Sequence, residues 1–566
     1  MQFLMAQQVP PGINIGCARL DHALGSSLFT VSLWFLSYRV VAIHGCRDAW
    51  FSDCMAFETS PSRGTQWHLP SMSSADEFLY RNIHRSRIRS PENKMDFYFN
   101  GQWSNGSQQL EVRNPFDGSV IDTVPVATES EVTEAITGAA GGFEDLKKVS
   151  AHQRSLFLRR AADLLGQRSE DFARIISQEE GKTLKEARGE TARAVQTMEL
   201  SAEEAKRLEG EVLPLDGAGG AAGKLGITLR VPCGIVAAIT PFNFPLNLVC
   251  HKVGPALAAG NAVLIKPASD TPLTSLMLVE ILLEAGCPPR AISCLTGGGS
   301  SVGRVLCGDP RIRKISFTGS KEVGESICRR AGLKRVTMEL GSNCPLVVLP
   351  DADLQKVVDA IALSGYANAG QVCISAQRVI VHREVQEELL QRLVPRIADL
   401  HAGNPLDEDS SIGPMVREAD AVRVESWIEE AVQGGAELLC GGQRQDALVS
   451  PALLTGVQRE MKLAREELFG PAVGMMVADD IDSAIRQAND SPYGLSAAVF
   501  TQNVDHALRF ANQVESGNIH INWGPLWRTD MMPYGGLKES GFGKEGPRYA
   551  IQEMTETKAV IFHSDF

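Results

Sequence analysis

The chain contains 566 residues, of which 44% are hydrophobic and 22% are charged, and its length predicts several domains with a core large enough to need no disulfide or metal. The formal net charge of −13 argues against nucleic acid or an anionic membrane as the main partner. The twelve cysteines are scattered without zinc-ligand spacing, which indicates a reducing, cytoplasmic setting and no metal site.

Residues 1–94 differ in composition from the rest of the chain. No lysine precedes Lys94, and three of the seven tryptophans lie in this tract. Residues 28–43 are mostly apolar, but the run is short for a membrane span and Arg39 interrupts it. The run also starts late for a secretory signal and lacks a clean cleavage pattern. We predict a poorly ordered extension, which a start assigned upstream of Met95 would explain, with a targeting peptide as the weaker alternative.

From Met95 onward, short apolar runs alternate with longer amphipathic segments. Helices are expected at 129–139 and 151–188, at a segment ending near 260, and at 273–285. The expected strands are 96–100, 234–239, 262–265, 291–295, 312–317, 335–338 and 346–349. Strands and helices that alternate at this spacing predict a parallel sheet with crossover helices. A second series, from residue 357 to 501, predicts a second α/β domain.

Residues 210–231 break this pattern. The segment is rich in glycine and ends in alternating apolar residues, which favours a protruding β-hairpin. Gly223 and Lys224 resemble part of a phosphate-binding loop, but Ala218 and Leu225 stand where that motif requires glycine and serine or threonine. We therefore reject a phosphate-loop nucleotidase. No strict G-x-G-x-x-G sequence follows a predicted strand either; residues 319–324 come nearest.

Three residues suggest chemistry in combination. Taken alone, Cys373 would be an inert buried thiol, Glu339 a solvated carboxylate, and Asn243 part of a tight turn. Together they supply a nucleophile, a general base and an oxyanion donor. A thiolate that attacks an aldehyde gives a tetrahedral oxyanion, which the Asn243 amide and the Cys373 backbone N–H could stabilise. Hydride transfer to a nicotinamide then leaves a thioester, which water activated by Glu339 could hydrolyse.

Seven motifs in order resemble those of the NAD(P)-dependent aldehyde dehydrogenase superfamily, over residues 95–563. The motifs are Thr-Pro-Phe-Asn-Phe-Pro (240–245), Ile-Lys-Pro-Ala-Ser (265–269), Phe-Thr-Gly-Ser (317–320), Met-Glu-Leu-Gly (338–341), Gly-Gln-Val-Cys (370–373), Glu-Glu-Leu-Phe-Gly-Pro (466–471) and Met-Pro-Tyr-Gly-Gly-Leu-Lys-Glu-Ser-Gly (532–541). Within the superfamily, these motif sequences are most similar to those of the lactaldehyde and non-phosphorylating glyceraldehyde-3-phosphate dehydrogenase members.

The resemblance implies a role for each motif residue. Cys373 would be the nucleophile, Glu339 the general base and Asn243 the oxyanion donor. Lys266 would bind the adenosine ribose, and Ser320, which opens a helix, would hold the pyrophosphate. The full set of implied cofactor-binding residues is Thr240, Pro241, Phe242, Lys266, Ser269, Gly299, Gly303, Phe317, Gly319, Ser320, Leu340, Glu467 and Phe469.

The same resemblance implies an α/β fold in three parts. A Rossmann-like cofactor domain would comprise residues 95–209 and 232–339, and an α/β catalytic domain residues 340–545. Residues 210–231 and 546–566 would form a β-hairpin oligomerisation element, which makes homodimers or homotetramers.

The resemblance also bears on cofactor and substrate. Ser269 stands where some relatives carry a glutamate that repels a 2′-phosphate, so NADP or dual use is expected. His251 and Arg528 occupy positions at which related enzymes bind anionic or hydroxylated aldehydes. The alternatives are that His251 is a satisfied buried histidine and that Arg528 pairs with Asp530. A short hydroxy- or semialdehyde is the expected substrate.

Two other functions stay open at this point. A CoA-acylating dehydrogenase of the same fold would need no general base, so Glu339 speaks against it. A catalytically silent binding protein would not need Cys373, Glu339 and Asn243 together.

Overall fold

The computed structural model describes residues 95–563, so the predicted N-terminal extension lies outside the described residues. Its first sheet has the order β2-β1-β9-β8-β7-β10-β11-β21, and the five strands from β9 to β11 are parallel. The strands are β1 (Phe97–Phe99), β2 (Gln102–Ser104), β7 (Ile235–Ile239), β8 (Ala262–Lys266), β9 (Ile292–Cys294), β10 (Ile312–Thr318), β11 (Arg335–Glu339) and β21 (Gly541–Phe542). The chain winds outward from β7 in both directions, as in doubly wound nucleotide-binding sheets.

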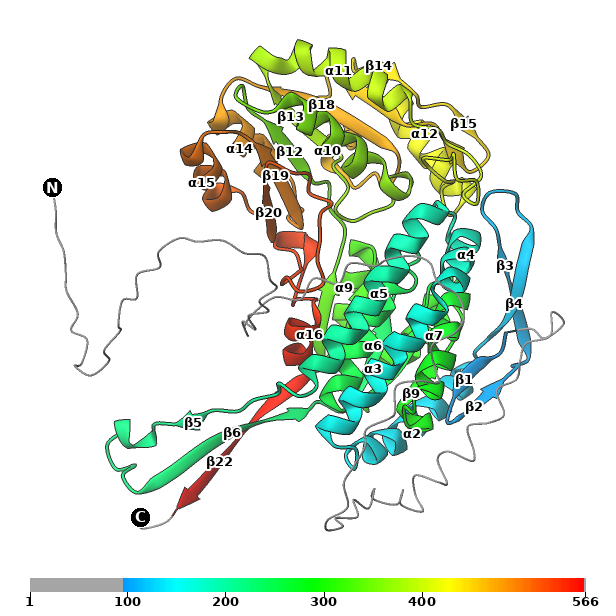
Figure 1. Cartoon of the computed structure of the whole chain (residues 1–566), viewed down its shortest axis with the longest axis vertical. Helices are drawn as coiled ribbons and strands as arrows, with labels where there is room; N and C mark the ends of the chain where they lie inside the picture. The colour runs from blue at the N-terminus through cyan, green and yellow to red at the C-terminus, as the bar shows by residue number, and fades with distance from the viewer. Residues whose placement is uncertain (1–94, 564–566) are drawn as a thin grey trace, which may run out of the picture. The chain divides into compact units, whose positions relative to one another are not determined.

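Helices cover both faces of this sheet, and β7 and β8 are therefore buried along their whole length. The helices are α2 (Glu129–Leu146), α3 (Ala151–Gln167), α4 (Ser169–Glu180), α5 (Leu184–Glu204), α6 (Asn247–Ala259), α7 (Leu273–Glu284), α8 (Arg304–Gly308) and α9 (Lys321–Ala331). Figure 1 shows α3, α4 and α5 as an outer layer over α6 and α7.

The single helix predicted for 151–188 is wrong, because this segment contains α3, α4 and the start of α5. Arg168 leaves helical geometry between α3 and α4, and Gly181 ends α4 in the left-handed conformation at φ 92°. Thr183 then starts α5 with a capping box, in which its side chain and that of Glu186 bond each other's backbone N–H. Both breaks are local and interrupt an otherwise continuous helical periodicity.

The second sheet has the order β14-β17-β18-β13-β12-β19-β20 and is parallel except for the edge strand β14. Its strands are β12 (Pro345–Val348), β13 (Arg378–His382), β14 (Glu437–Cys440), β17 (Ala452–Thr455), β18 (Ala472–Ala478), β19 (Ser496–Phe500) and β20 (Asn518–Ile521). Its helices are α10 (Leu354–Tyr366), α11 (Gln386–Ala398), α12 (Glu418–Gln433), α13 (Lys462–Arg465), α14 (Ile481–Asn489) and α15 (Val504–Gln513). The sheet has its own hydrophobic core, separate from that of the first.

A three-stranded antiparallel ribbon projects from the body, at the lower left of Figure 1. It contains β5 (Val212–Leu213), β6 (Lys224–Pro232) and β22 (Thr555–His563). The hairpin predicted for 210–231 is therefore present, and β22 pairs with β6 over its full length. The predicted boundary at residue 546 needs correction, because α16 (Pro547–Glu553) packs on α5 and α6 and only β22 joins the ribbon.

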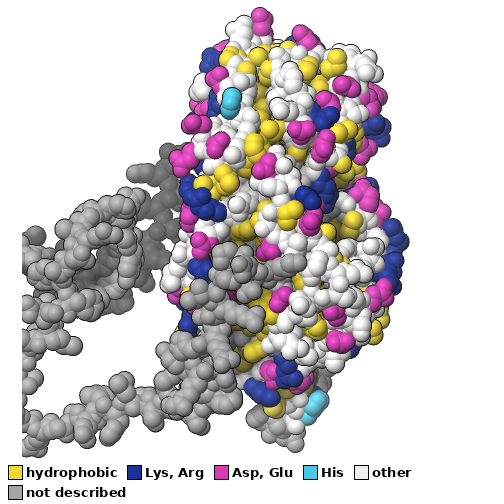
Figure 2. Space-filling view, turned by 90° about the vertical axis from the view of Figure 1, so that its right-hand side faces the viewer, with side chains coloured by type: hydrophobic (Ala, Val, Ile, Leu, Met, Phe, Trp, Pro, Cys, Tyr) yellow, Lys and Arg dark blue, Asp and Glu magenta, His cyan; other side chains and the backbone are white. Residues whose placement is uncertain are grey.

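Two minor pairs complete the described secondary structure: β3 (Gln108–Arg113) with β4 (Val120–Val126), and β15 (Arg444–Gln445) with β16 (Leu448–Val449). On the face shown in Figure 2, basic and acidic side chains are interspersed, so neither sign dominates that surface. Among residues 95–563, no helix has both the length and the apolar composition that crossing a membrane requires.

Candidate active site

A cavity of about 1230 Å³ lies at the carboxyl ends of the strands of the first sheet and reaches the second α/β unit. Ligands bind doubly wound sheets at this edge, where the order of strands reverses. The residues that follow β7 and β10, together with Glu339 at the end of β11, form much of its wall. Every catalytic and cofactor-binding residue predicted from the sequence lines this one cavity. The structure thus brings together residues between 240 and 469 in the sequence.

Cys373 reaches the cavity from a strained turn after α10. Asn368 and Ala369 adopt left-handed conformations there, and Gly370 follows with φ 69°. A side chain at Gly370 would place its Cβ 2.1 Å from the Gly470 carbonyl oxygen, so this position requires glycine. The Cys373 thiol is half-buried, and burial raises its pKa to about 12. The thiol therefore needs a nearby group that favours its charged form before it can act as a nucleophile.

Glu339 is the last residue of β11, and its side chain is buried in the cavity wall. Neither of its carboxylate oxygens has a hydrogen-bond partner among the described residues. Burial raises the pKa of Glu339 well above its ordinary range, and the neighbouring Glu545 carboxylate raises it further. An unpartnered carboxylate with a raised pKa is suited to accept a proton from water near neutral pH.

Asn243 is held in place from both sides of the site. Its side-chain Nδ2 donates to the backbone oxygen of Gln371 at 2.8 Å, which ties it to the turn that carries Cys373. The backbone carbonyl oxygen of Asn243 accepts hydrogen bonds from Lys182 Nζ at 2.7 Å and from Asn368 Nδ2 at 3.3 Å. One N–H of the amide is used for Gln371, which leaves the second free to bind a developing oxyanion.

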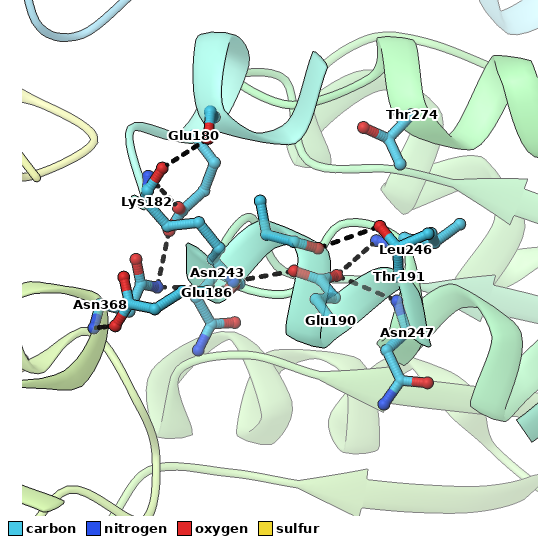
Figure 3. A network of polar contacts seen from close by, with 12 residues as sticks. Glu180, Lys182, Glu186, Glu190, Thr191, Asn243, Leu246, Asn247, Thr274 and Asn368 are labelled. Atoms are coloured by element: carbon cyan, nitrogen blue, oxygen red, sulfur yellow. Dashed lines mark hydrogen bonds and ion pairs between the residues drawn. The ribbon is translucent and has the colours of Figure 1, made fainter. Parts of the chain in front are cut away.

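Buried charges between α4 and α6 support this arrangement, as Figure 3 shows. Lys182 Nζ lies 2.8 Å from Glu190 Oε2, and both side chains are at most 1% exposed. The other oxygen of Glu190 accepts the backbone N–H groups of Leu246 and Asn247, at 2.9 and 3.0 Å. Sequence reasoning missed Lys182 and Glu190, because neither belongs to a motif; Lys182 lies within the segment 151–188 predicted as one surface helix, and Glu190 lies just beyond it.

The opposite end of the cavity can hold a dinucleotide. The Lys266 ammonium is buried and donates to the Pro267 carbonyl at 2.9 Å, which leaves further N–H groups for ligand hydroxyls. Ser320 caps the first turn of α9, whose N-terminus faces the cavity and favours an anion such as a pyrophosphate. Burial lowers the pKa of Lys266 to about 8. These donors match the ribose and phosphate groups of NAD(P).

A carboxylate and two aromatic rings form part of the cavity wall. A Cβ at Gly341 would lie 2.1 Å from a carboxylate oxygen of Glu467, so glycine is what lets this carboxylate approach the backbone. Glu467 Oε1 also accepts the Ser342 N–H at 2.9 Å. The rings of Phe242 and Phe469 meet edge to face, with centroids 5.8 Å apart. Aromatic rings beside a buried carboxylate offer an apolar contact and a hydrogen-bond acceptor, which a nicotinamide riboside could use.

His251 and Arg528, the predicted substrate contacts, do not line this cavity. Both are buried, and Arg528 NH2 lies 3.2 Å from His251 Nε2 and 3.1 Å from Glu545 Oε2. The alternative pairing of Arg528 with Asp530 is wrong, because Asp530 instead pairs with His251 at 2.8 Å and Arg193 at 2.7 Å. Arg528 approaches Cys373 through Tyr534, whose ring it covers.

Residues 103–560 match the aldehyde dehydrogenase family. The chain is 45% identical over 466 residues to 3-sulfolactaldehyde dehydrogenase from Priestia aryabhattai, which covers 82% of this chain and 97% of that protein. It is 39% identical to lactaldehyde dehydrogenase from Methanococcus aeolicus, over 82% of this chain and 100% of that protein. Among solved structures, glyceraldehyde-3-phosphate dehydrogenase GapN from Methanocaldococcus jannaschii, complexed with NADP, aligns with a TM-score of 0.77 and 38% identity, over 80% of this chain and 98% of that one.

These matches confirm the resemblance that the seven motifs carry, the α/β fold class, and the prediction of an NAD(P)-dependent oxidoreductase.

Within residues 95–563, the structure groups no three His, Cys, Asp or Glu side chains as a metal ion would require.

Proposed function

Because the chain belongs to the aldehyde dehydrogenase family, we propose that it oxidises a short hydroxy- or semialdehyde to the carboxylic acid through a thioester on Cys373. The observation that carries this proposal is one cavity that joins Cys373, Asn243 and Glu339 to a slot with dinucleotide-binding chemistry. The division into a cofactor domain, a catalytic domain and a ribbon is part of the same proposal.

Each residue of the site has one task in the proposed mechanism. The Cys373 thiolate attacks the aldehyde carbon, and the resulting oxyanion accepts hydrogen bonds from Asn243 Nδ2 and the Cys373 backbone N–H. Bound NAD(P)+ supplies the hydride acceptor for this thiohemiacetal. Glu339 then takes a proton from water, which attacks the thioester and releases the acid. The thiolate leaves and is ready for another turnover.

The decisive experiment identifies the product of the reaction. We expect wild-type protein to form free acid and NAD(P)H at full rate without CoA, and Cys373→Ala to form neither. A requirement for CoA would instead favour the acylating alternative. A failure to reduce NAD and NADP with any short aldehyde would favour the silent binding protein. Normal aldehyde oxidation by Cys373→Ala would refute the assignment of the nucleophile.

The proposed substrate class rests on the surroundings of the thiol and on the relatives. A small apolar cluster of Cys344, Val372, Ile374, Leu495 and Tyr534 packs beside Cys373. The relatives are named for sulfolactaldehyde, lactaldehyde and glyceraldehyde-3-phosphate, all short hydroxyaldehydes. A panel of hydroxyaldehydes and semialdehydes, with and without an anionic group, would identify the preferred member. A preference for long alkyl aldehydes would contradict the proposal.

We propose NADP or dual cofactor use because of Ser269. This serine lines the cavity, and its hydroxyl lies 3.3 Å from the Gly297 carbonyl, so no carboxylate stands at this position. Lys266 brings positive charge to the same end. We expect Ser269→Glu to lower kcat/KM for NADP more than for NAD, because a carboxylate would repel the 2′-phosphate. An unchanged cofactor ratio would exclude Ser269 as the determinant.

We propose that the ribbon joins subunits into dimers or tetramers. Leu225, Leu229, Ile561 and Phe562 on β6 and β22 are each at least 37% exposed, more apolar surface than a free ribbon would favour. Sedimentation analysis of Leu229→Asp should show smaller species than wild type, while a monomeric wild type would refute the idea.

The nine free cysteines among residues 95–563 suit the reducing cytoplasm, which we propose as the location of the protein.

A further inference from the structure

Tyr534 touches the reacting sulfur. Its hydroxyl lies 3.0 Å from Cys373 Sγ, although the two residues are 161 positions apart in the sequence. The tyrosine is only 3% exposed, and its ring packs in the small apolar cluster beside the thiol. Backbone hydrogen bonds in both directions with Glu545, at 3.2 and 2.7 Å, fix the loop that carries it. These bonds therefore hold the Tyr534 hydroxyl in contact with the Cys373 sulfur.

A cation lies on the other side of the same ring. The Arg528 guanidinium carbon is 3.7 Å from the centroid of the Tyr534 ring, within cation–π distance. Arg528 is itself held by an ion pair with Glu545 at 3.1 Å, and its NH2 lies 3.2 Å from His251 Nε2. A positive charge against the ring draws electron density from the phenol and makes its O–H a stronger hydrogen-bond donor. Glu545 also pairs with Lys252 at 2.7 Å, so these buried charges are anchored in α6.

The direction of the hydrogen bond depends on the state of the sulfur. In the thiol form either atom can donate, but a thiolate has no proton and can only accept. Burial raises the pKa of Tyr534 well above its ordinary range, so the phenol keeps its proton near neutral pH. Burial also opposes ionisation of Cys373, and the hydrogen bond from Tyr534 acts against that effect.

We propose that Tyr534 is a catalytic residue, which donates a hydrogen bond to the Cys373 thiolate while Arg528 holds and polarises its ring. This inference rests on the proposed role of Cys373 as nucleophile. The thiol proton is released to solvent through the cavity, and Tyr534 keeps its own. The same hydrogen bond is weak to the neutral sulfur of the thioester and strong to the thiolate that leaves. Tyr534 thus favours both attack on the aldehyde and release of the acid.

The test measures ionisation of the thiol directly. Iodoacetamide alkylates thiolates, and peptide mass spectrometry reports Cys373 separately from the other cysteines. At a fixed pH below the pKa of the thiol, the alkylation rate is proportional to the thiolate fraction. We expect Tyr534→Phe to lower the rate of Cys373 alkylation at pH 8 by about 10- to 100-fold, the size of a hydrogen bond to a charged group. The phenylalanine keeps the ring and its packing. Tyr549→Phe on α16 loses the same atom outside the cavity lining and should leave this rate unchanged.

The outcomes separate this inference from the function on which it rests. If Cys373→Ala is inactive and Tyr534→Phe leaves the alkylation rate unchanged, Tyr534 only packs against the thiol and the inference is wrong. If Cys373→Ala stays active, the proposed function fails, whatever Tyr534→Phe does. Slower alkylation of Cys373 in Tyr534→Phe, together with a lower kcat, supports the inference. Melting curves of both tyrosine variants check that the fold is intact, and an equal loss of alkylation rate in Tyr549→Phe would also refute the inference.

Discussion

Replacing Lys182 by methionine tests whether buried charge holds the oxyanion donor in place. Burial alone would lower the pKa of Lys182, but Glu190 and Glu180 more than offset this effect, so its pKa lies above the ordinary value and the ammonium is charged. The side chain also lies 3.9 Å over the Phe244 ring. Lys182→Met removes the cation and leaves the Glu190 carboxylate buried without it.

The expected loss of stability is large. Removing one partner of a buried ion pair costs about 3–5 kcal/mol, because an uncompensated charge remains in the interior. The loss should appear in urea unfolding as a lower midpoint with an unchanged slope. Lys147→Met is the matched control, since its pair with Glu144 is 48% and 63% exposed and is worth about 0–1 kcal/mol.

A second variant separates charge from packing. In Lys182→Met/Glu190→Gln, the glutamine oxygen can still accept the N–H groups of Leu246 and Asn247, and position 190 no longer carries a buried charge without its cation. Part of the lost stability should return, while kcat stays low because the Asn243 carbonyl has lost its bond to Lys182. If Lys182→Met costs no more than Lys147→Met, the buried pair does not stabilise the site and the reasoning is refuted.

Three further predictions follow from the same site. Because the pKa of Glu339 is raised, its carboxylate form gains population as pH rises, so steady-state turnover should climb through a limb above pH 4.5. Glu339→Gln should lack this limb and give one burst of NAD(P)H before stalling; normal turnover would exclude Glu339 as the base. Gly370→Ala should lower both the melting temperature measured by calorimetry and the kcat measured in kinetic assays, because its Cβ would meet a carbonyl oxygen at 2.1 Å. Gly166→Ala in α3, where a Cβ meets nothing within 4 Å, should be neutral or stabilising, and equal effects at both positions would refute the steric argument. Lys266→Met should raise KM for the dinucleotide far more than KM for the aldehyde, and equal increases in both would contradict its place at the cofactor end.

The sequence predicted what depends on local pattern. Thr128 precedes the helix predicted for 129–139 and caps α2 with Glu131. The short apolar runs predicted between 234 and 349 became parallel strands, whereas the run at 96–100 became the antiparallel strand β1. The predicted catalytic and cofactor-binding residues, from Thr240 to Phe469, all line one cavity, because loops after parallel strands share an edge.

What the sequence could not predict depends on contacts between distant residues. Lys182 reads as one more charge in a helical segment, and only the fold shows that it meets the Asn243 carbonyl, 61 residues away. Tyr534 belongs to a recognised motif, but nothing in that motif reveals contact with Cys373. Arg528 looked like a partner for nearby Asp530, while the folded chain offered it Glu545. Burial and partner choice are properties of the tertiary structure.

The pairing of β6 with β22 has a consequence for biosynthesis. Lys224 and His563 are partners at one end of the ribbon although 339 residues separate them. During translation the edge of β6 that later meets β22 therefore stays open until the whole second sheet has been made, since β5 pairs with the other edge. Leu225 and Leu229, both exposed, lie on this strand. Unpaired apolar edges are where nascent chains associate wrongly. The interval between the synthesis of β6 and that of β22 is thus a period in which this edge is open to wrong pairing.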